Sequence, residues 1–114
     1  MIPVLSAEDV RRQDAACEAR GISTSTLMGN AGYAVARAVR ELLGGTYGRR
    51  IVVVCGKGNN AGDGLVAGRR LAAWGAHVTA VMTLGNDLTG AARAARQAFP
   101  GRVRGAEEIL RELD

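Results

Sequence analysis

The stretch Cys55-Gly56-Lys57-Gly58-Asn59-Asn60-Ala61-Gly62-Asp63-Gly64 carries the residue types best suited to chemistry in this chain of 114 residues. It follows a run of β-branched residues and precedes a segment with helical periodicity. The turn between a strand and a helix offers free backbone N–H groups at the positive end of the helix dipole, and glycines let an anion approach that backbone closely. The stretch therefore predicts a binding site for a phosphate or pyrophosphate group.

Two common phosphate-binding patterns do not fit this stretch. A P-loop needs a Gly-Lys-Ser/Thr ending, but Lys57 comes early and no Ser or Thr follows it in the stretch. Gly56, Gly58 and Ala61 match the dinucleotide pattern GxGxxG/A formally. The supporting acid about 20 residues further on is missing, because Val81-Met82-Thr83 stands there. A redox Rossmann dehydrogenase is therefore disfavoured.

The polar side chains of the stretch allow more than one interpretation. Asn60 as a helix N-cap with Asp63 at N3 would be a reciprocal cap that needs no ligand. The amide oxygens of Asn59 and Asn60 also suit an alkali or alkaline-earth cation, although Asn is equally at home in turns. Asp63 would serve either in proton transfer or in capping, and Lys57 either contacts a phosphate or is a solvated turn residue.

The remaining titratable candidates favour structural roles. Cys55 ends an apolar run with no base near it in sequence, so we expect a small core residue rather than a nucleophile. His77, the only histidine, begins a second apolar run and is expected at the surface. Cys17 and Cys55 form neither a CxxC nor a disulfide framework, which favours the reducing cytoplasm.

Hydrophobic periodicity predicts the elements that position these residues. The run Ile51 to Cys55 is typical of a strand buried on both faces, as in a parallel sheet. Alternation of short apolar runs and helical patterns then continues along the chain. The expected elements are helix 62–74, strand 77–82, helix 89–98, a weak strand at Val103 and a short helix 107–113. This order predicts an α/β, Rossmann-like three-layer fold with a mostly parallel sheet.

Two helices are expected before the first strand. Ser6 and Asp9 form a capping-box pattern ahead of a helix over 7–20. A second helix carries an apolar stripe from Met28 to Leu42, with N-cap candidates at 24–26 and a stop at Gly44-Gly45. Because two or three strands make a very small parallel sheet, we expect the first half of a larger domain, or else a domain completed by a partner chain.

Composition narrows the functional classes. The chain has 15 Lys and Arg residues against 11 Asp and Glu, a net charge of +4, and 47% hydrophobic residues. Only 4% of residues are aromatic and acids lie near most arginine pairs, which argues against a nucleic-acid-binding protein. No apolar run is long enough to span a membrane, and the start lacks the pattern of a secretory leader. We expect a globular protein of the cytoplasm.

Beyond these patterns, the sequence GKGNNAGDGLVAGRRLAAWGAHVTAV resembles the signature of the YjeF N-terminal family, the NAD(P)H-hydrate epimerases. That family has GNNGGDG after a hydrophobic strand. The segment 27–32, LMGNAG, resembles the family's LMENAG, and 10–14 with 21–23 fit its first helical pair. The resemblance spans about residues 5 to 100 and identifies 1–114 as such a domain, truncated on its C-terminal side.

The resemblance implies an activity and a set of site residues. The family interconverts the R and S forms of NADHX and NADPHX at C6 of the hydrated nicotinamide ring, as metabolite repair. By position, Asn59, Asn60, Ala61, Gly62 and Asp63 would bind the nucleotide, and Asn60 would be a ligand of a potassium ion. The implied partners are a fused or separate NAD(P)H-hydrate dehydratase and a second copy of the chain in a homodimer.

Departures from the family pattern leave alternatives open. Ala61 replaces a glycine, and Gly29 replaces a glutamate in the middle of a helix, which costs about 1 kcal/mol against alanine. Family domains are about twice as long, so the catalytic acid or base is expected beyond residue 114. A non-catalytic nucleotide-binding or scaffolding module, or an inactive fragment, are the alternatives to the epimerase.

Overall fold

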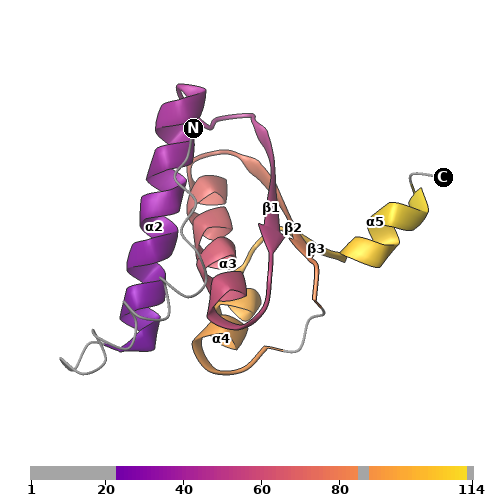
Figure 1. The fold of residues 1–114 in the computed structure, drawn as a ribbon. Helices are drawn as coiled ribbons and strands as arrows, with labels where there is room; N and C mark the ends of the chain where they lie inside the picture. The colour runs from indigo at the N-terminus through magenta and orange to yellow at the C-terminus, as the bar shows by residue number, and fades with distance from the viewer. Residues whose placement is uncertain (1–22, 85–87, 113–114) are drawn as a thin grey trace.

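The fold, shown in Figure 1, comes from a computed structural model that describes residues 23–84 and 88–112. The elements are α2 (Thr24–Leu43), β1 (Arg50–Cys55), α3 (Gly58–Ala73), β2 (His77–Met82), α4 (Gly90–Ala98), β3 (Arg102–Gly105) and α5 (Ala106–Glu112). The strands pair in parallel in the order β1-β2-β3. The predicted α/β class and parallel sheet are confirmed, including the weak third strand, whereas the helix predicted over 7–20 lies outside the described residues.

The ends of α2 are set by a hydroxyl and by a glycine. The Ser23 side chain accepts a hydrogen bond from the Thr26 backbone N–H at 3.2 Å, so Ser23 is the N-cap and the predicted cap at 24–26 is wrong by at least one residue. At the other end Gly44 adopts φ 68°, a left-handed conformation that favours glycine. The predicted stop at Gly44-Gly45 is confirmed. None of the helices in the described ranges is long and apolar enough to cross a membrane.

Helix α3 lies close against one face of the sheet because glycines occupy the contact. A Cβ at Gly64 would lie 3.1 Å from Val53 Cγ1. A Cβ at Gly68 would lie 2.8 Å from Phe99 Cε1 and 3.2 Å from Val78 Cγ1. The helix side chains that point the same way, Leu65 and Leu71, are buried in the core. Small residues on α3 therefore let a short sheet and a long helix share one well-packed core.

A second layer of helices covers the outer side of α3. Met28 of α2 packs directly over Gly62, where a Cβ would collide with its thioether. Gly32 of α2 receives Val66 of α3 in the reverse arrangement. The Tyr33 and Trp74 rings meet edge to face, with centroids 6.0 Å apart. Figure 1 shows α2, α3 and α4 together on one side of the sheet.

The other side of β1 is open. Val52 and Val54 are 63% and 68% exposed, so the prediction of a first strand buried on both faces is wrong for one face. Helix α5 follows β3 on that side, where Arg104 forms ion pairs with Glu108 and Glu112. Among the described residues α5 is the helix on this second side, and it leaves Val52 and Val54 uncovered.

Glycine-to-alanine substitutions should separate packing from helix propensity. Gly68→Ala should lower the free energy of unfolding by about 1 to 2 kcal/mol, because the added methyl group overpacks the contact with Phe99 and Val78. Gly29→Ala should raise it by about 0.5 to 1 kcal/mol, because no atom lies within 4 Å of the new Cβ in the middle of α2. Urea unfolding followed by circular dichroism measures both. Stabilisation by both substitutions would contradict the close approach of α3 to the sheet.

Candidate functional site

The helix that follows β1 begins earlier than the sequence predicts. Its first residue is Gly58 and its N-cap is Lys57, whereas periodicity placed the start near residue 62. The stretch interpreted as a loop therefore forms the first turn of α3. Asn60 as N-cap is wrong, because it lies inside the helix. The N-cap residue is Lys57, and its side chain forms no capping hydrogen bond.

An uncapped helix end of this kind favours an anion. The first backbone N–H groups of a helix have no carbonyl partner within it. Here those groups belong to Gly58, Asn59 and Asn60, which are all exposed. The first turn contains no acidic residue that would offset the positive end of the helix dipole, and Lys57 adds an exposed ammonium group beside it. This end of α3 can hold a phosphate group by backbone hydrogen bonds and charge.

The glycines of the stretch divide into two kinds. Gly58 has φ 60°, which a side chain would strain, and it turns the chain from β1 into α3. Gly62 and Gly64 instead serve packing, against Met28 of α2 and against Val53 and Cys55 of β1. Of these three glycines, only Gly58 therefore shapes the amino end of α3. The sequence alone did not make this distinction.

A threonine that sequence analysis passed over fixes the geometry next to this helix end. Thr83 follows β2, where a dinucleotide-binding domain would place its acid. Its backbone N–H and its hydroxyl both donate to the Cys55 carbonyl, at 3.1 and 2.9 Å. The carboxyl ends of β1 and β2 are thereby joined at the edge of the sheet where open α/β sheets bind ligands. The signal available in the sequence was its position directly after the second strand.

The structure brings the predicted nucleotide-binding residues to one helix end, but in different environments. Asn59 and Asn60 are exposed. Ala61 is fully buried with negative φ, so the methyl group in place of glycine is accommodated. Gly62 is buried under Met28, and Asp63 is half-buried one turn further along α3. Asn59 and Asn60 can offer side chains to a ligand, whereas Gly62 lies within the helix packing.

Cys55 and the possible metal ligands bear on the chemistry of the site. Burial raises the pKa of the Cys55 thiol, so it stays protonated at neutral pH, as expected for a core residue. In the described part of the chain no three His, Cys, Asp or Glu residues cluster as metal ligands. An alkali cation is a different case, since neutral amide and carbonyl oxygens suffice for it, and the exposed Asn60 can supply one such oxygen.

Comparison with known proteins identifies the domain type. The family model described as YjeF-related protein N-terminus matches residues 24–103, from the start of α2 into β3. The chain belongs to this family. The matched range contains the uncapped end of α3, the Thr83 contact and the glycines that hold α3 in place.

Relatives of this YjeF-related domain are considerably longer. A bifunctional NAD(P)H-hydrate repair enzyme Nnr of Thermanaerovibrio acidaminovorans is 36% identical over 105 residues, 90% of this chain and 20% of the relative. An NAD(P)H-hydrate epimerase of Nitrosopumilus maritimus is 46% identical over 66 residues, 58% of this chain and 30% of the relative.

A solved structure gives the same picture of the fold. The crystal structure of yeast ynu0 matches with a TM-score of 0.71 at 25% identity, covering 94% of this chain and 49% of the yeast chain. This YjeF-related domain thus spans about half the length of the solved structure and less than a third of the two curated relatives.

Thiol reactivity tests the environment of Cys55 at the end of β1. In a Cys17→Ser background, we expect Cys55 to react with an aromatic disulfide reagent at least about a hundred times more slowly in the native protein than in urea, because it is buried and its pKa is raised. The rate should rise with pH, since thiolate is the reactive form. Fast native modification at pH 7 would contradict the buried placement.

Proposed function

We propose that this chain is the nucleotide-binding part of an NAD(P)H-hydrate epimerase domain, acting in the interconversion of the R and S forms of NADHX and NADPHX. The uncapped amino end of α3 is the observation that carries the proposal. It lies in the segment that the family model matches, and similar proteins carry the names NAD(P)H-hydrate epimerase and NAD(P)H-hydrate repair enzyme. A substrate with a pyrophosphate is the kind of anion that such a helix end favours.

In this proposal the main chain of α3 does most of the binding. The N–H groups of Gly58, Asn59 and Asn60 donate to the phosphate oxygens, and Lys57 supplies a positive charge. The side chains of Asn59 and Asn60 are exposed at the same end and would add hydrogen bonds to the nucleotide. The hydrogen bond from Thr83 to the Cys55 carbonyl holds the carboxyl ends of β1 and β2 together beside the site. A rigid site lowers the entropy cost of binding.

We further propose that Asn60 is a ligand of a potassium ion. The amide oxygen of Asn60 is exposed and is a hard donor of the type that alkali cations take. The positive end of the helix dipole disfavours a lone cation here, so the negative charge of the dinucleotide would have to accompany it. The potassium ion would neutralise part of that charge, and binding of ion and dinucleotide should be coupled.

The catalytic step needs a group that moves a proton or stabilises a departing hydroxyl at C6. Asp63 is the acid nearest to the site in sequence, and it is half-buried on α3 beyond the first turn. We assign it no catalytic role and propose that the general acid or base comes from family sequence beyond this chain. We also propose a cytoplasmic setting, a homodimer, and a fused or separate dehydratase that uses the S form, a pairing suggested by the bifunctional relatives.

Calorimetric titration with an NADPHX-like dinucleotide tests the binding part of this proposal. We expect binding in potassium chloride that weakens at least about tenfold, or 1.4 kcal/mol, in lithium chloride. Asn60→Ala should reduce the affinity in potassium to the lithium level or below it, because it removes the proposed ion ligand together with the amide hydrogen bond to the nucleotide. Lys57→Ala should weaken binding in both salts, because it removes only charge.

Asn30→Ala is the matched control, since Asn30 is an exposed asparagine on α2 outside the proposed ligand set. It should leave the affinity unchanged. Binding that persists in lithium and in Asn60→Ala would reject potassium but keep the nucleotide site. A folded chain that binds no dinucleotide in either salt would reject the nucleotide site in this half. An assay of R-NADHX epimerisation, monitored by chromatography, then distinguishes a catalytic domain from a module that only binds.

A further inference from the structure

Four arginines of α2 and α3 have no ion pair with an acid in the part of the chain that the structure describes. The Arg40 guanidinium lies 4.1 Å from the centre of the Trp74 ring. Arg70 and Arg37 lie 5.2 and 5.7 Å from the centre of the Tyr33 ring. Together with Arg69 on α3, all are exposed, and none has a carboxylate partner within residues 23–84 and 88–112. These side chains therefore keep their full positive charge and most of their N–H donors for another molecule.

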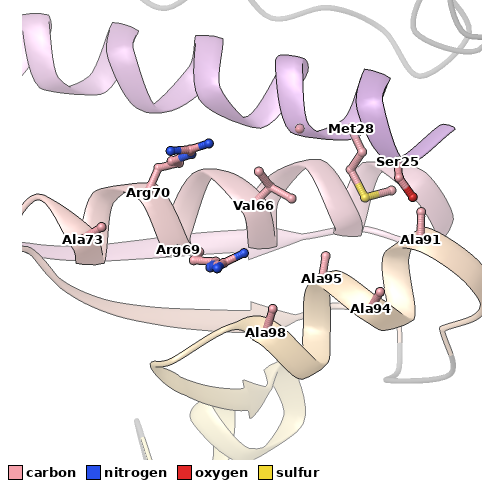
Figure 2. A pocket seen from close by; sticks show the side chains of 11 residues that line it. Ser25, Met28, Val66, Arg69, Arg70, Ala73, Ala91, Ala94, Ala95 and Ala98 are labelled. Carbon is pink, nitrogen blue, oxygen red and sulfur yellow. The ribbon is translucent and has the colours of Figure 1, made fainter. Parts of the chain in front are cut away.

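An apolar groove runs beside these arginines. It has a volume of about 480 Å³ and lies between α2 and α4 over the outer side of α3. Its apolar lining includes Met28, Val66, Ala91, Ala94, Ala95 and Ala98. Figure 2 shows Arg70 pointing toward α2 and Arg69 toward α4, with Val66 next to them on α3. Of the described lining residues, Arg69 and Arg70 are charged, so the groove is apolar along its floor and cationic on the sides toward α2 and α4.

We propose that this groove binds an amphipathic helix of a partner protein, with a narrow apolar stripe flanked by carboxylates on both sides. Short alanine side chains allow the axis of a bound helix to come close, in the manner of helix-in-groove recognition. Carboxylates on one flank meet Arg69, and those on the other meet Arg70 and then Arg37. The charge complementarity steers the encounter, and burial of the apolar stripe supplies the lasting affinity.

The same observations disfavour a single-stranded nucleic acid as the occupant. Such ligands stack their bases on exposed aromatic rings. The Tyr33 and Trp74 rings pack against each other and are each covered by a guanidinium group, which removes the faces a base would need. Among the described residues that line the groove, none is aromatic. An acidic helix uses both the charge and the apolar floor, whereas a nucleic acid would use the charge alone.

The charged part of the groove lies away from the proposed nucleotide end of α3, and only its Met28 end reaches Gly62. Its charged part, at Arg69 and Arg70, lies about three turns further along the helix than Gly58. The inference therefore does not depend on the proposed epimerase function, and its test need not involve a nucleotide.

A designed peptide tests the proposal with the full chain. The probe is a fluorescent helical peptide of about three heptads, with Leu and Ala at a and d and Glu at e and g. Its binding is measured by fluorescence anisotropy. Arg69→Glu with Arg70→Glu should weaken binding at least about tenfold. Ala94→Trp should do the same without changing the charge, because it fills the groove from an exposed position that tolerates a larger side chain.

Arg102→Glu with Arg111→Glu is the matched control, since it makes the same charge change at exposed residues outside the groove. It should alter the affinity by less than about threefold. An equal loss in this control, or unchanged binding by Ala94→Trp, would overturn the proposal, because binding would then follow net charge alone. Binding of a polythymidine strand more tightly than the peptide, with the same dependence on Arg69 and Arg70, would also overturn it. Circular dichroism and urea unfolding of each variant check that the fold is intact.

Discussion

The close approach of α3 to its neighbours on both sides is the constraint on which the rest of the structure depends. Gly64 and Gly68 let the helix rest on β1 and β2, and Gly62 lets Met28 of α2 rest on the helix. With this helix fixed between the two layers, its amino end can lie only at the carboxyl end of β1. The position of the exposed backbone N–H groups at that end is therefore a result of packing as much as of the residues found there.

Much of the architecture could be predicted from the sequence, because hydrophobic periodicity reports local structure well. The apolar stripe of α2, the β-branched run of β1 and the glycines after α2 led to elements that differ from the observed ones by few residues. The start of α3 could not be predicted in the same way. Rules for helix starts rely on a side-chain cap, and they pointed to Asn60, whereas this helix begins with a left-handed Gly58 and has no side-chain cap. Rules that rely on side-chain caps do not detect a helix start that is formed by the backbone alone.

Other features could not be predicted because they depend on contacts between distant segments. A continuous apolar run indicates that a strand avoids water, but not which chain or segment covers it. The run therefore did not predict that Val52 and Val54 are exposed. The arginines of α2 and α3 look scattered and partly balanced by acids along the sequence. In the folded chain Arg37, Arg40 and Arg70 lie over two aromatic rings, and none of them forms an ion pair with an acid among the described residues. No local pattern in the sequence indicates that these arginines share one surface.

The exposure of β1 affects how copies of the protein associate in a concentrated solution. β1 lies at one end of the strand order, with no strand beside it in the described part of the chain, and it carries a row of two exposed valines. The unpaired backbone of such an edge is a template on which a strand of another copy can add, and the valines on the open face add an apolar contact. Repulsion between copies that each carry a net charge of +4 opposes this addition at low ionic strength. Salt screens that repulsion and leaves the valines unchanged, so the colloidal stability of a concentrated solution should be set by its ionic strength more than by the unfolding of the domain.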